Sequence, residues 1–583
     1  MNRTSTAEQQ VPSSQNVQQP VHEGIPEKAV SEQATRAFNV RDLVDFVATL
    51  ALLVVLVRAF GVEGYIISTG SMAPHLLGYH KRVVCPSCGE VFAVGVRQGE
   101  NPPTRAVCPN CGEYRIDISK VPVNTGDQLL VHKQAFEFCQ PRRWNVVVFR
   151  NPEKPTQAYV KRLVGLPGET IRIKNGDVYI NGSIARKNLK QQEATRILVY
   201  DADHAPAPAA DWRPRWTMQK GWRRQNGTFS FNASLVEADS AEEIDFHETA
   251  SNRFYWLAYR HWIRTGGQHQ TTTLIRPWPP DLPARLPELP ELQTLELVPK
   301  EEILRCRGVL TPQAERELLT LSKAVHWKQA VRRLAEASHV APVTDQYAYD
   351  QGFARSESNL VQDLMLDCWL QPLHGSGRLV FRMLDGRHVY DCIFDLKHNT
   401  LRLFLDGRNK VIRQSELPEL VRQQPFEFEL STFDRQILAA INKREVFCVP
   451  INEASLTSGS TASNVVYKNL RFALSRPVYI GAQKVNVVLQ HLRLYRDIFY
   501  TSAGTVRATE ADYKLGPDEY FFLGDNSPVS LDSRCWSDPI VHRNMFFGKP
   551  LVLHLPSKPL AVRLGKRVVY IRIPDFSRIG YIR

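Results

Sequence analysis

One run of this chain is almost entirely apolar, and many shorter runs alternate between apolar and polar residues. The apolar run covers residues 43–62, LVDFVATLALLVVLVRAFGV. A helix needs about 20 predominantly apolar residues to cross a bilayer. The run therefore predicts one membrane-spanning helix over 43–62, with a cleaved signal peptide or a buried soluble helix as the alternatives. Residues 1–36 lack any apolar period, so they predict a disordered tail.

Short apolar runs beside turn signals predict β-strands after this segment. Three of them lie over 126–133, 142–150 and 159–169. A longer series over about 359–500 consists of runs that alternate between apolar and polar residues and are separated by Asp-Gly and other turn signals. Many short strands at regular spacing are typical of a β-sandwich, and this series loosely resembles concanavalin-like or laminin-G-like jelly rolls. The predicted fold class is therefore mainly β.

Between the two strand series lies a stretch rich in tryptophan, with Trp212, Trp216, Trp222, Trp256 and Trp262. This stretch could supply the first strands of the sandwich. Exposed tryptophans could stack on a sugar ring, so a glycan or protein ligand of the sandwich is one hypothesis. The alternative is that these side chains fill the core. A charged stretch over 314–338, with Leu and Val at helical spacing, predicts a helix.

The composition describes a large, basic chain. It has 583 residues and a formal charge of +13, which is too long for one ordinary domain. A basic surface attracts phosphate, either in nucleic acid or on an anionic membrane. Lys and Arg are spread along the chain, and no nucleic-acid-binding motif is recognisable. We therefore expect a lipid bilayer and no nucleic acid among the partners.

Four of the ten cysteines form two CxxC pairs, Cys85 with Cys88 and Cys108 with Cys111. Two such pairs separated by a short loop predict a structural zinc ribbon over 85–112, because four thiolates complete a tetrahedral zinc site. Two disulfides are the alternative. The other six cysteines are scattered and predict free thiols rather than a disulfide framework.

A candidate nucleophile, Ser71, lies directly after the apolar run, and a candidate base, Lys161, lies in a predicted strand. A serine hydroxyl needs a base to become a nucleophile. Lysine can be that base only when it is neutral, which requires burial in an apolar place to lower its pKa. Neither residue is informative alone, since most serines and lysines lie on the solvated surface.

The surrounding sequence blocks make the pair specific. STGSMAP, GDQLLVHK, YVKRLVGLPGE and LGDNSPVSLDSR follow the apolar run in this order, and together they resemble the type I signal peptidase family. The resemblance covers about 43–182 and 515–550, apart from an insertion. It implies a β catalytic core over 63–84, 113–184 and 514–583, interrupted by the zinc-ribbon-like insert and by a large insert over 185–513.

The resemblance implies a role for each site residue. Ser71 is the nucleophile and Lys161 the general base, while the Ser71 N–H and the Thr69 hydroxyl donate to the developing oxyanion. The supporting residues are Ser530, which holds the lysine amine, the ion pair of Asp532 with Arg534, and Arg162. Asp525 is interpreted as a turn residue. Trp144-Asn145 departs from the Gly-Asp that is usual in the family. No cofactor is expected for catalysis.

By the same resemblance, the substrates are secretory precursors with small residues before the cleavage site. The protein is expected in the inner (cytoplasmic) membrane with a single pass, the N-terminus in the cytoplasm and the catalytic domain outside. One alternative is an inactive membrane scaffold whose sandwich binds protein or glycan. Another is a self-cleaving regulator, but that class has a DNA-binding segment and no membrane anchor, whereas this chain shows the reverse.

Overall fold

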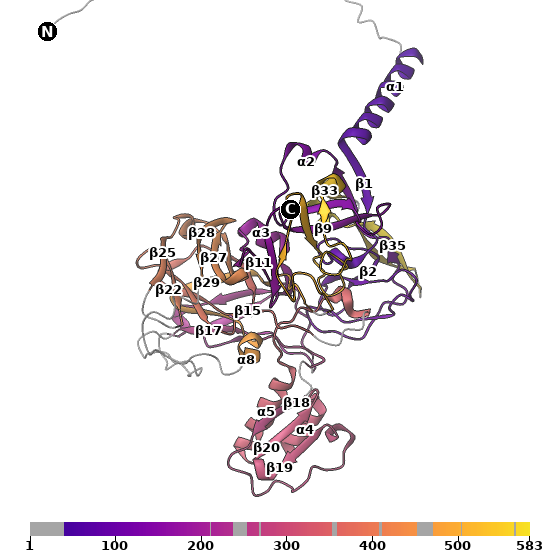
Figure 1. The fold of residues 1–583 in the computed structure, drawn as a ribbon. Helices are drawn as coiled ribbons and strands as arrows, with labels where there is room; N and C mark the ends of the chain where they lie inside the picture. The colour runs from indigo at the N-terminus through magenta and orange to yellow at the C-terminus, as the bar shows by residue number, and fades with distance from the viewer. Residues whose placement is uncertain are drawn as a thin grey trace, which may run out of the picture. The chain divides into compact units, whose positions relative to one another are not determined.

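The computed structural model describes residues 40–209, 211–236, 254–266, 270–352, 358–406, 411–451, 470–502, 504–554, 556–564 and 567–582. The predicted disordered tail over 1–36 lies outside them. The chain divides into two compact units, Met1–Val57 and Arg58–Arg583. The described part of the second unit is built mainly of β-strands (Figure 1), as expected from the alternating runs.

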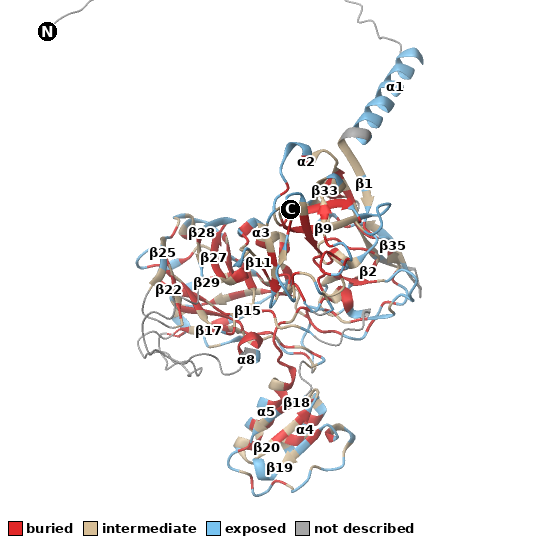
Figure 2. Cartoon of the chain, in the orientation of Figure 1, coloured by how far each residue is buried: buried red, intermediate tan, exposed pale blue. Residues whose placement is uncertain are grey.

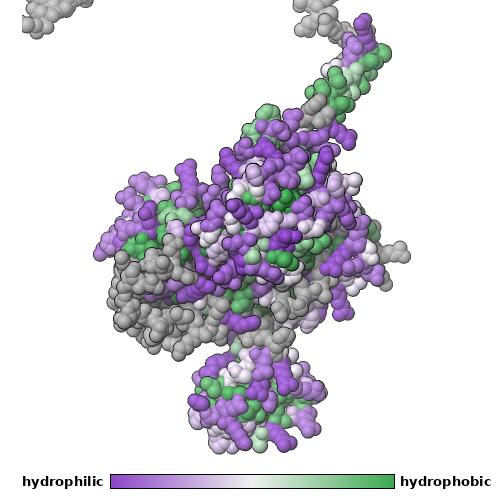
Figure 3. Space-filling model, in the orientation of Figure 1, coloured by the Kyte–Doolittle hydropathy of each residue, from purple (hydrophilic) through white to green (hydrophobic). Residues whose placement is uncertain are grey.

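Helix α1, Val40–Leu56, and Val57 are the described part of the first unit. The side chains of α1 are exposed and most are apolar (Figures 2 and 3). The chain then forms a π-helical turn, Val57–Gly61, and strand β1, Val62–Ile66. None of the helices in the described residues is long and apolar enough to cross a membrane. The helix predicted over 43–62 ends earlier than expected, because residues 57–61 form the π-helical turn and Val62 begins β1.

The predicted catalytic core is built on an eight-stranded sheet with the order β1-β7-β33-β8-β9-β31-β32 and with β36 beside β33. The sheet pairs strands that the large insert separates in sequence, since β9 lies next to β31. Its further strands are β7 (Gln128–His132), β8 (Val146–Arg150), β9 (Ala158–Gly165), β31 (Glu519–Leu523), β32 (Val541–His542), β33 (Phe546–His554) and β36 (Gly580–Tyr581). The three strands predicted over 126–169 are thus confirmed.

Smaller sheets and one short helix, α2 (Ala135–Phe138), accompany this core. One sheet consists of β10 (Thr170–Lys174), β11 (Asp177–Ile180), β12 (Ser183–Ile184) and β30 (Tyr513–Lys514). The others are β2 (His80–Val84), β3 (Val91–Gly95) and β6 (Val123–Asn124), then β4 (Arg105–Ala106) with β5 (Ile116–Asp117), and β34 (Ser557–Leu564) with β35 (Arg567–Pro574). The CxxC pairs lie in loops among β2–β5.

The large insert contains the predicted sandwich-like arrangement of sheets, organised around the long strand β29 (Val478–Arg496). The first half of β29 pairs with β22 and β17, and its second half pairs with β21, β16 and β13. Apolar residues from both halves share one core. The strands are β13 (Ile197–Asp201), β14 (Trp216–Met218), β15 (Trp222–Gln225), β16 (Thr228–Phe231), β17 (Tyr255–Tyr259), β21 (Leu364–Leu370), β22 (His374–Leu384), β23 (Val389–Asp395), β24 (Thr400–Leu405), β25 (Val411–Glu416), β26 (Phe426–Ser431), β27 (Gln436–Ile441) and β28 (Arg444–Pro450).

The tryptophan-rich stretch supplies strands β14–β17, as its position suggested. Its tryptophans are core residues, because Trp212, Trp216, Trp222, Trp256 and Trp262 are each at most 8% exposed. The hypothesis that these five side chains stack on a sugar is therefore wrong. Short helices α3 (Leu189–Thr195), α6 (Leu420–Gln423) and α8 (Leu470–Ser475) complete this part.

A small α/β unit within the insert has a core of its own. It combines β18 (Gln270–Leu274), β19 (Leu295–Val298) and β20 (Ile303–Arg307) with helices α4 (Pro312–Thr320) and α5 (Val325–His339). The single helix predicted over 314–338 is therefore two helices. They separate where Asp281 binds the Ser322 hydroxyl and the Lys323 N–H, which holds the backbone outside the helical ladder.

Candidate active site

The turn that carries Ser71 follows shortly after β1. Gly70–Met72 form one turn of 3-10 helix, η2, and Met72 is buried in the core beneath it. The Ser71 carbonyl accepts a hydrogen bond from the Asn526 N–H at 3.0 Å, and Asn526 Nδ2 donates to the Gly70 carbonyl at 3.1 Å. These two hydrogen bonds from Asn526 fix the backbone of the turn, while Ser71 is only partly buried.

Lys161 comes from β9 and reaches the serine directly. Its Nζ donates to Ser71 Oγ at 2.5 Å, and the residue is only 3% exposed. Burial lowers the pKa of Lys161 to about 8, although the carboxylates of Asp532 and Asp525 act in the opposite direction. A large fraction of this lysine is therefore neutral near pH 8, which is the state a general base requires.

The other predicted groups lie close to the serine, with one difference from expectation. Thr69 Oγ1 lies 3.5 Å from Ser71 Oγ, and Thr69 is exposed. Ser530 is buried, but its hydroxyl has no hydrogen-bond partner among the described residues. It packs so tightly against Gly524 that a Cβ there would lie 2.1 Å from Ser530 Oγ. The expected hydrogen bond from Lys161 to Ser530 is thus not formed in this structure.

Two fully buried ion pairs support the site. Arg534 and Asp532 are 2.7 Å apart, and the same carboxylate accepts from the Gly524 N–H. Arg162, beside Lys161 on β9, binds both oxygens of Asp525 at 2.7 and 2.6 Å. Burial alone would raise the pKa of Asp525, but Arg162 holds it well below its usual range. Asp525 is therefore an ionised partner rather than a simple turn residue, which the adjacent glycine had concealed.

Sequence reasoning missed one part of the site's surroundings. The 3-10 segment η6, Ala348–Gly352, belongs to the large insert and yet packs against the Ser71 turn and β3. Asp350 Oδ1 accepts from Asn526 Nδ2 at 2.8 Å, and the Tyr349 ring leaves no room for a side chain at Gly70. Neither residue lies in a recognisable motif, so no signal in the sequence pointed to them.

The four CxxC cysteines converge in space. Their sulfur atoms lie within 4.8 Å of one another, with Cys85 3.6 Å from Cys111 and Cys88 3.7 Å from Cys108. None of the ten cysteines forms a disulfide in the described residues. Zn²⁺ bound to four sulfurs at about 2.3 Å in a tetrahedron separates them by about 3.8 Å. The cysteines therefore have the spacing that a four-thiolate zinc site needs.

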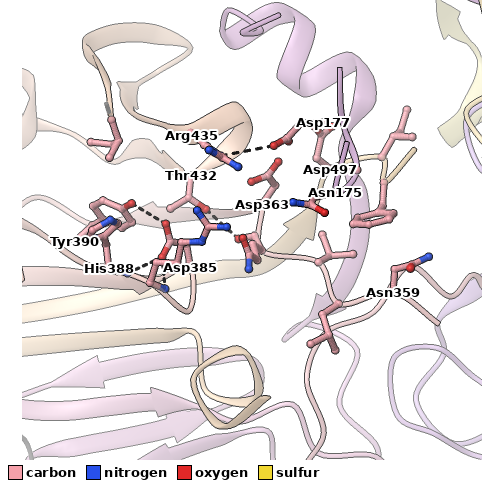
Figure 4. A pocket seen from close by; sticks show the side chains of 18 residues that line it. Asn175, Asp177, Asn359, Asp363, Asp385, His388, Tyr390, Thr432, Arg435 and Asp497 are labelled. Carbon is pink, nitrogen blue, oxygen red and sulfur yellow. Dashed lines mark hydrogen bonds and ion pairs between the residues drawn. The ribbon is translucent and has the colours of Figure 1, made fainter. Parts of the chain in front are cut away.

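A separate polar cavity of about 330 Å³ lies where the core meets the large insert (Figure 4). Asp177 on β11 lines it together with Asp363 and Asp497 from the insert. Carboxylate oxygens of Asp177, Asp363 and Asp434 lie within 4.8 Å of one another, and Arg435 lies 3.7 Å from Asp177. Burial, followed by the charge of Asp434, raises the pKa of Asp177 to about 7.

A buried lysine neutralises part of this acidic group. Lys187 Nζ binds Asp434 at 2.6 Å and Asp497 at 2.7 Å, and it lies 4.5 Å from the centre of the Trp144 ring. Burial alone would lower the pKa of Lys187, but the two carboxylates raise it above its ordinary value. The network links the start of the insert, its far strands and the catalytic core.

Solved structures align with part of this chain at low scores. The carbohydrate binding module CBM66 from Bacillus subtilis has a TM-score of 0.17 at 14% identity, covering 23% of this chain and 74% of that one. Sheep galectin-11 has a TM-score of 0.16 at 12% identity, covering 23% and 91%.

Known sequences give a more specific comparison. Residues 118–229, which include Lys161, match the family described as signal peptidase, peptidase S26. Signal peptidase I of Leptolyngbya laminosa is 37% identical over 76 residues, 12% of this chain and 37% of that protein. Signal peptidase I of Pseudomonas aeruginosa is 36% identical over 87 residues, and signal peptidase I V of Bacillus subtilis 40% over 57.

The matched segments span about a third of the length of these curated relatives. The family match includes the strand that carries the candidate base, and Ser71 lies outside it. Residues 118–229 of this chain are therefore similar to the signal peptidase family.

Proposed function

We propose that this protein is a membrane-attached serine endopeptidase that removes signal peptides from secretory precursors. The observation that carries the proposal is the contact between Ser71 Oγ and the buried Lys161 Nζ at 2.5 Å. A serine hydrogen-bonded to a lysine whose pKa is lowered to about 8 gives the site both the nucleophile and the base that acyl transfer needs.

In the proposed reaction, Ser71 Oγ attacks the scissile carbonyl while neutral Lys161 takes the hydroxyl proton. Lys161 then gives that proton to the leaving amine, which leaves an acyl-enzyme on Ser71. Water, deprotonated by the same lysine, breaks the ester and restores Ser71. The Ser71 N–H and the Thr69 hydroxyl are the proposed donors to the oxyanion, because both lie beside the attacking oxygen.

Membrane attachment is proposed through α1. Its large apolar side chains are exposed on all sides, among them Leu43, Phe46, Leu50, Leu53 and Val54. A helix that is apolar all round is stable only when something apolar surrounds it. Precursors with small residues before the cleavage site, and a catalytic core outside the cytoplasm, are proposed from the family alone.

The test uses the full chain in detergent micelles and a precursor peptide with alanine before the cleavage site. Ser71→Ala should lower kcat/KM by about 10³-fold or more while the melting temperature stays within a few degrees, because it removes the nucleophile alone. Ser533→Ala, at a buried serine that binds the Phe522 N–H, is a matched control and should keep kcat/KM. Cleavage by Ser71→Ala at the wild-type rate would contradict the proposal.

We further propose that Cys85, Cys88, Cys108 and Cys111 hold a structural zinc ion. The support is their mutual spacing and the Gly89 and Gly112 N–H groups, which donate to the Cys85 and Cys108 carbonyls and close each loop. With four thiolates there is no open position for water, so the zinc takes no part in the reaction.

Metal analysis of the purified chain should find about one zinc per molecule. Cys88→Ser should lower the zinc content and the melting temperature, whereas Cys535→Ser, at an exposed free cysteine, should change neither. Absence of zinc together with two disulfides by mass spectrometry would show that the oxidised alternative is right.

A further inference from the structure

The large insert contributes a segment to the support of the catalytic turn. Asp350 on η6 is 5% exposed and Asn526 is completely buried. Asp350 Oδ1 accepts from Asn526 Nδ2 at 2.8 Å, and the same amide group donates to the Gly70 carbonyl at 3.1 Å. Asp350 therefore orients the amide that binds the residue just before Ser71.

The hydrogen bond from Asn526 to the Gly70 carbonyl also affects the Ser71 N–H, because both groups belong to one peptide unit. A peptide unit is planar and trans, so the Gly70 C=O and the Ser71 N–H point in opposite directions. Fixing the Gly70 oxygen therefore also fixes the direction of the Ser71 N–H. The Asn526 N–H holds the next carbonyl, that of Ser71, at 3.0 Å, which fixes the far side of the residue.

Further contacts of η6 and of the residue just before it fix the position of Asp350. The Tyr349 hydroxyl donates to the Tyr79 carbonyl at 2.9 Å, and the Tyr347 hydroxyl just before η6 donates to the Asp525 carbonyl at 2.7 Å. A Cβ at Gly70 would lie 2.2 Å from the Tyr349 ring, so the turn and the ring are in close contact. Tyr347 and η6 thus pack against both sequence blocks, the one that contains Ser71 and the one that contains Asp525.

We propose that Asp350 is a positioning residue of the peptidase: acting through Asn526, it aims the Ser71 N–H at the oxyanion. This inference rests on the proposed function. It assigns the large insert a part in catalysis, because a residue between its small α/β unit and strand β21 orients a group of the active site. Preorganised donors matter because their direction is set before charge develops on the substrate.

The test compares Asp350→Ala with Asp350→Asn in the full chain. Alanine removes the acceptor, so we expect kcat to fall about ten- to hundredfold with KM unchanged, less than the loss of a whole oxyanion donor. Asparagine keeps an acceptor oxygen and should restore kcat to within about threefold. The affinity of a peptide aldehyde, whose adduct with Ser71 needs the same donors, should fall in parallel with kcat for Asp350→Ala alone.

Asp391→Ala is the matched control. Asp391 is a buried carboxylate of the sandwich, 2.7 Å from Arg382, and has no contact with the site among the described residues. Its loss should lower the melting temperature and leave the kcat of the folded enzyme unchanged. If Asp350→Ala does not fold, Asp350→Ser takes its place, since serine is too short to reach Asn526.

Wild-type kcat for Asp350→Ala, or equal losses for the alanine and asparagine variants, would overturn the inference. These outcomes differ from a failure of the proposed function, in which the wild-type chain cleaves no precursor or cleaves it without Ser71. A fall in kcat for Asp350→Ala that Asp391→Ala reproduces would also overturn the inference, because it would reflect stability alone.

Discussion

Two buried lysines show how this protein uses the same side chain in two ways. Lys161 in the catalytic core and Lys187 at the start of the large insert are both only 3% exposed. Lys161 binds the neutral hydroxyl of Ser71, and its pKa is lowered to about 8. Lys187 binds the carboxylates of Asp434 and Asp497, and its pKa is raised.

The difference between the two regions is the partner and not the burial. Among the carboxylates that raise the pKa of Lys161, Asp532 has the largest effect. Asp532 is bound to Arg534 at 2.7 Å, so its charge is largely compensated. The carboxylates at Lys187 bind the amine directly. Burial therefore lowers the pKa of a lysine where the nearby anions are paired elsewhere, which favours the proposed base role, and it gives a structural ion pair where they are not.

The largest expected effect comes from Lys161→Met, which removes the amine and keeps the volume. Precursor cleavage should fall by about 10³-fold or more, because no base remains for Ser71. The melting temperature should be unchanged or higher, since a buried lysine without a bound carboxylate is replaced by an apolar side chain. A variant that loses stability as well as activity would show that Lys161 has a structural role like that of Lys187.

The same substitution at the other lysine should have the opposite result. Lys187→Met leaves Asp434 and Asp497 buried without their cation, which should destabilise the fold by about 3–5 kcal/mol in urea or thermal unfolding. The kcat/KM of the folded fraction should stay near the wild-type value. The loss of stability should be smaller at pH 5, because burial raises the pKa of Asp434 and its carboxyl group can then take up a proton. Equal stability of Lys187→Met and wild type would remove the distinction.

The smallest expected effect is on the pH dependence of kcat/KM, which should follow the protonation of Lys161 and not that of Lys187. In the proposed mechanism Lys161 acts when neutral, and burial lowers its pKa to about 8. The kcat/KM should therefore rise about tenfold per pH unit below pH 8 and level off above it. Lys187→Arg should leave this midpoint in place, because the pKa of Lys187 is raised and it stays charged throughout. A profile that is flat between pH 6 and 9 would exclude Lys161 as the titrating base.

Local patterns predicted much of the core. Apolar runs beside turn signals marked β7, β8 and β9, and alternating runs separated by turn signals marked the strands around β29. The end of the first helix was placed too late because Val62, which the apolar run included, pairs with His132 as the start of β1, and this is a tertiary contact. The tryptophans could not be assigned from sequence, since a side chain in a half-buried strand faces core or solvent according to the opposing sheet.

By itself the sequence determined the chemistry that is available: a serine, a lysine in an apolar strand, paired CxxC motifs and the blocks of a known family. Only the tertiary structure decided which charges meet. Whether a buried lysine is neutral depends on carboxylates that are distant in sequence, and the same holds for the contact of Asp350 with Asn526. The physical reason is that desolvation and hydrogen bonding act over a few ångströms in space, and sequence spacing does not record such distances.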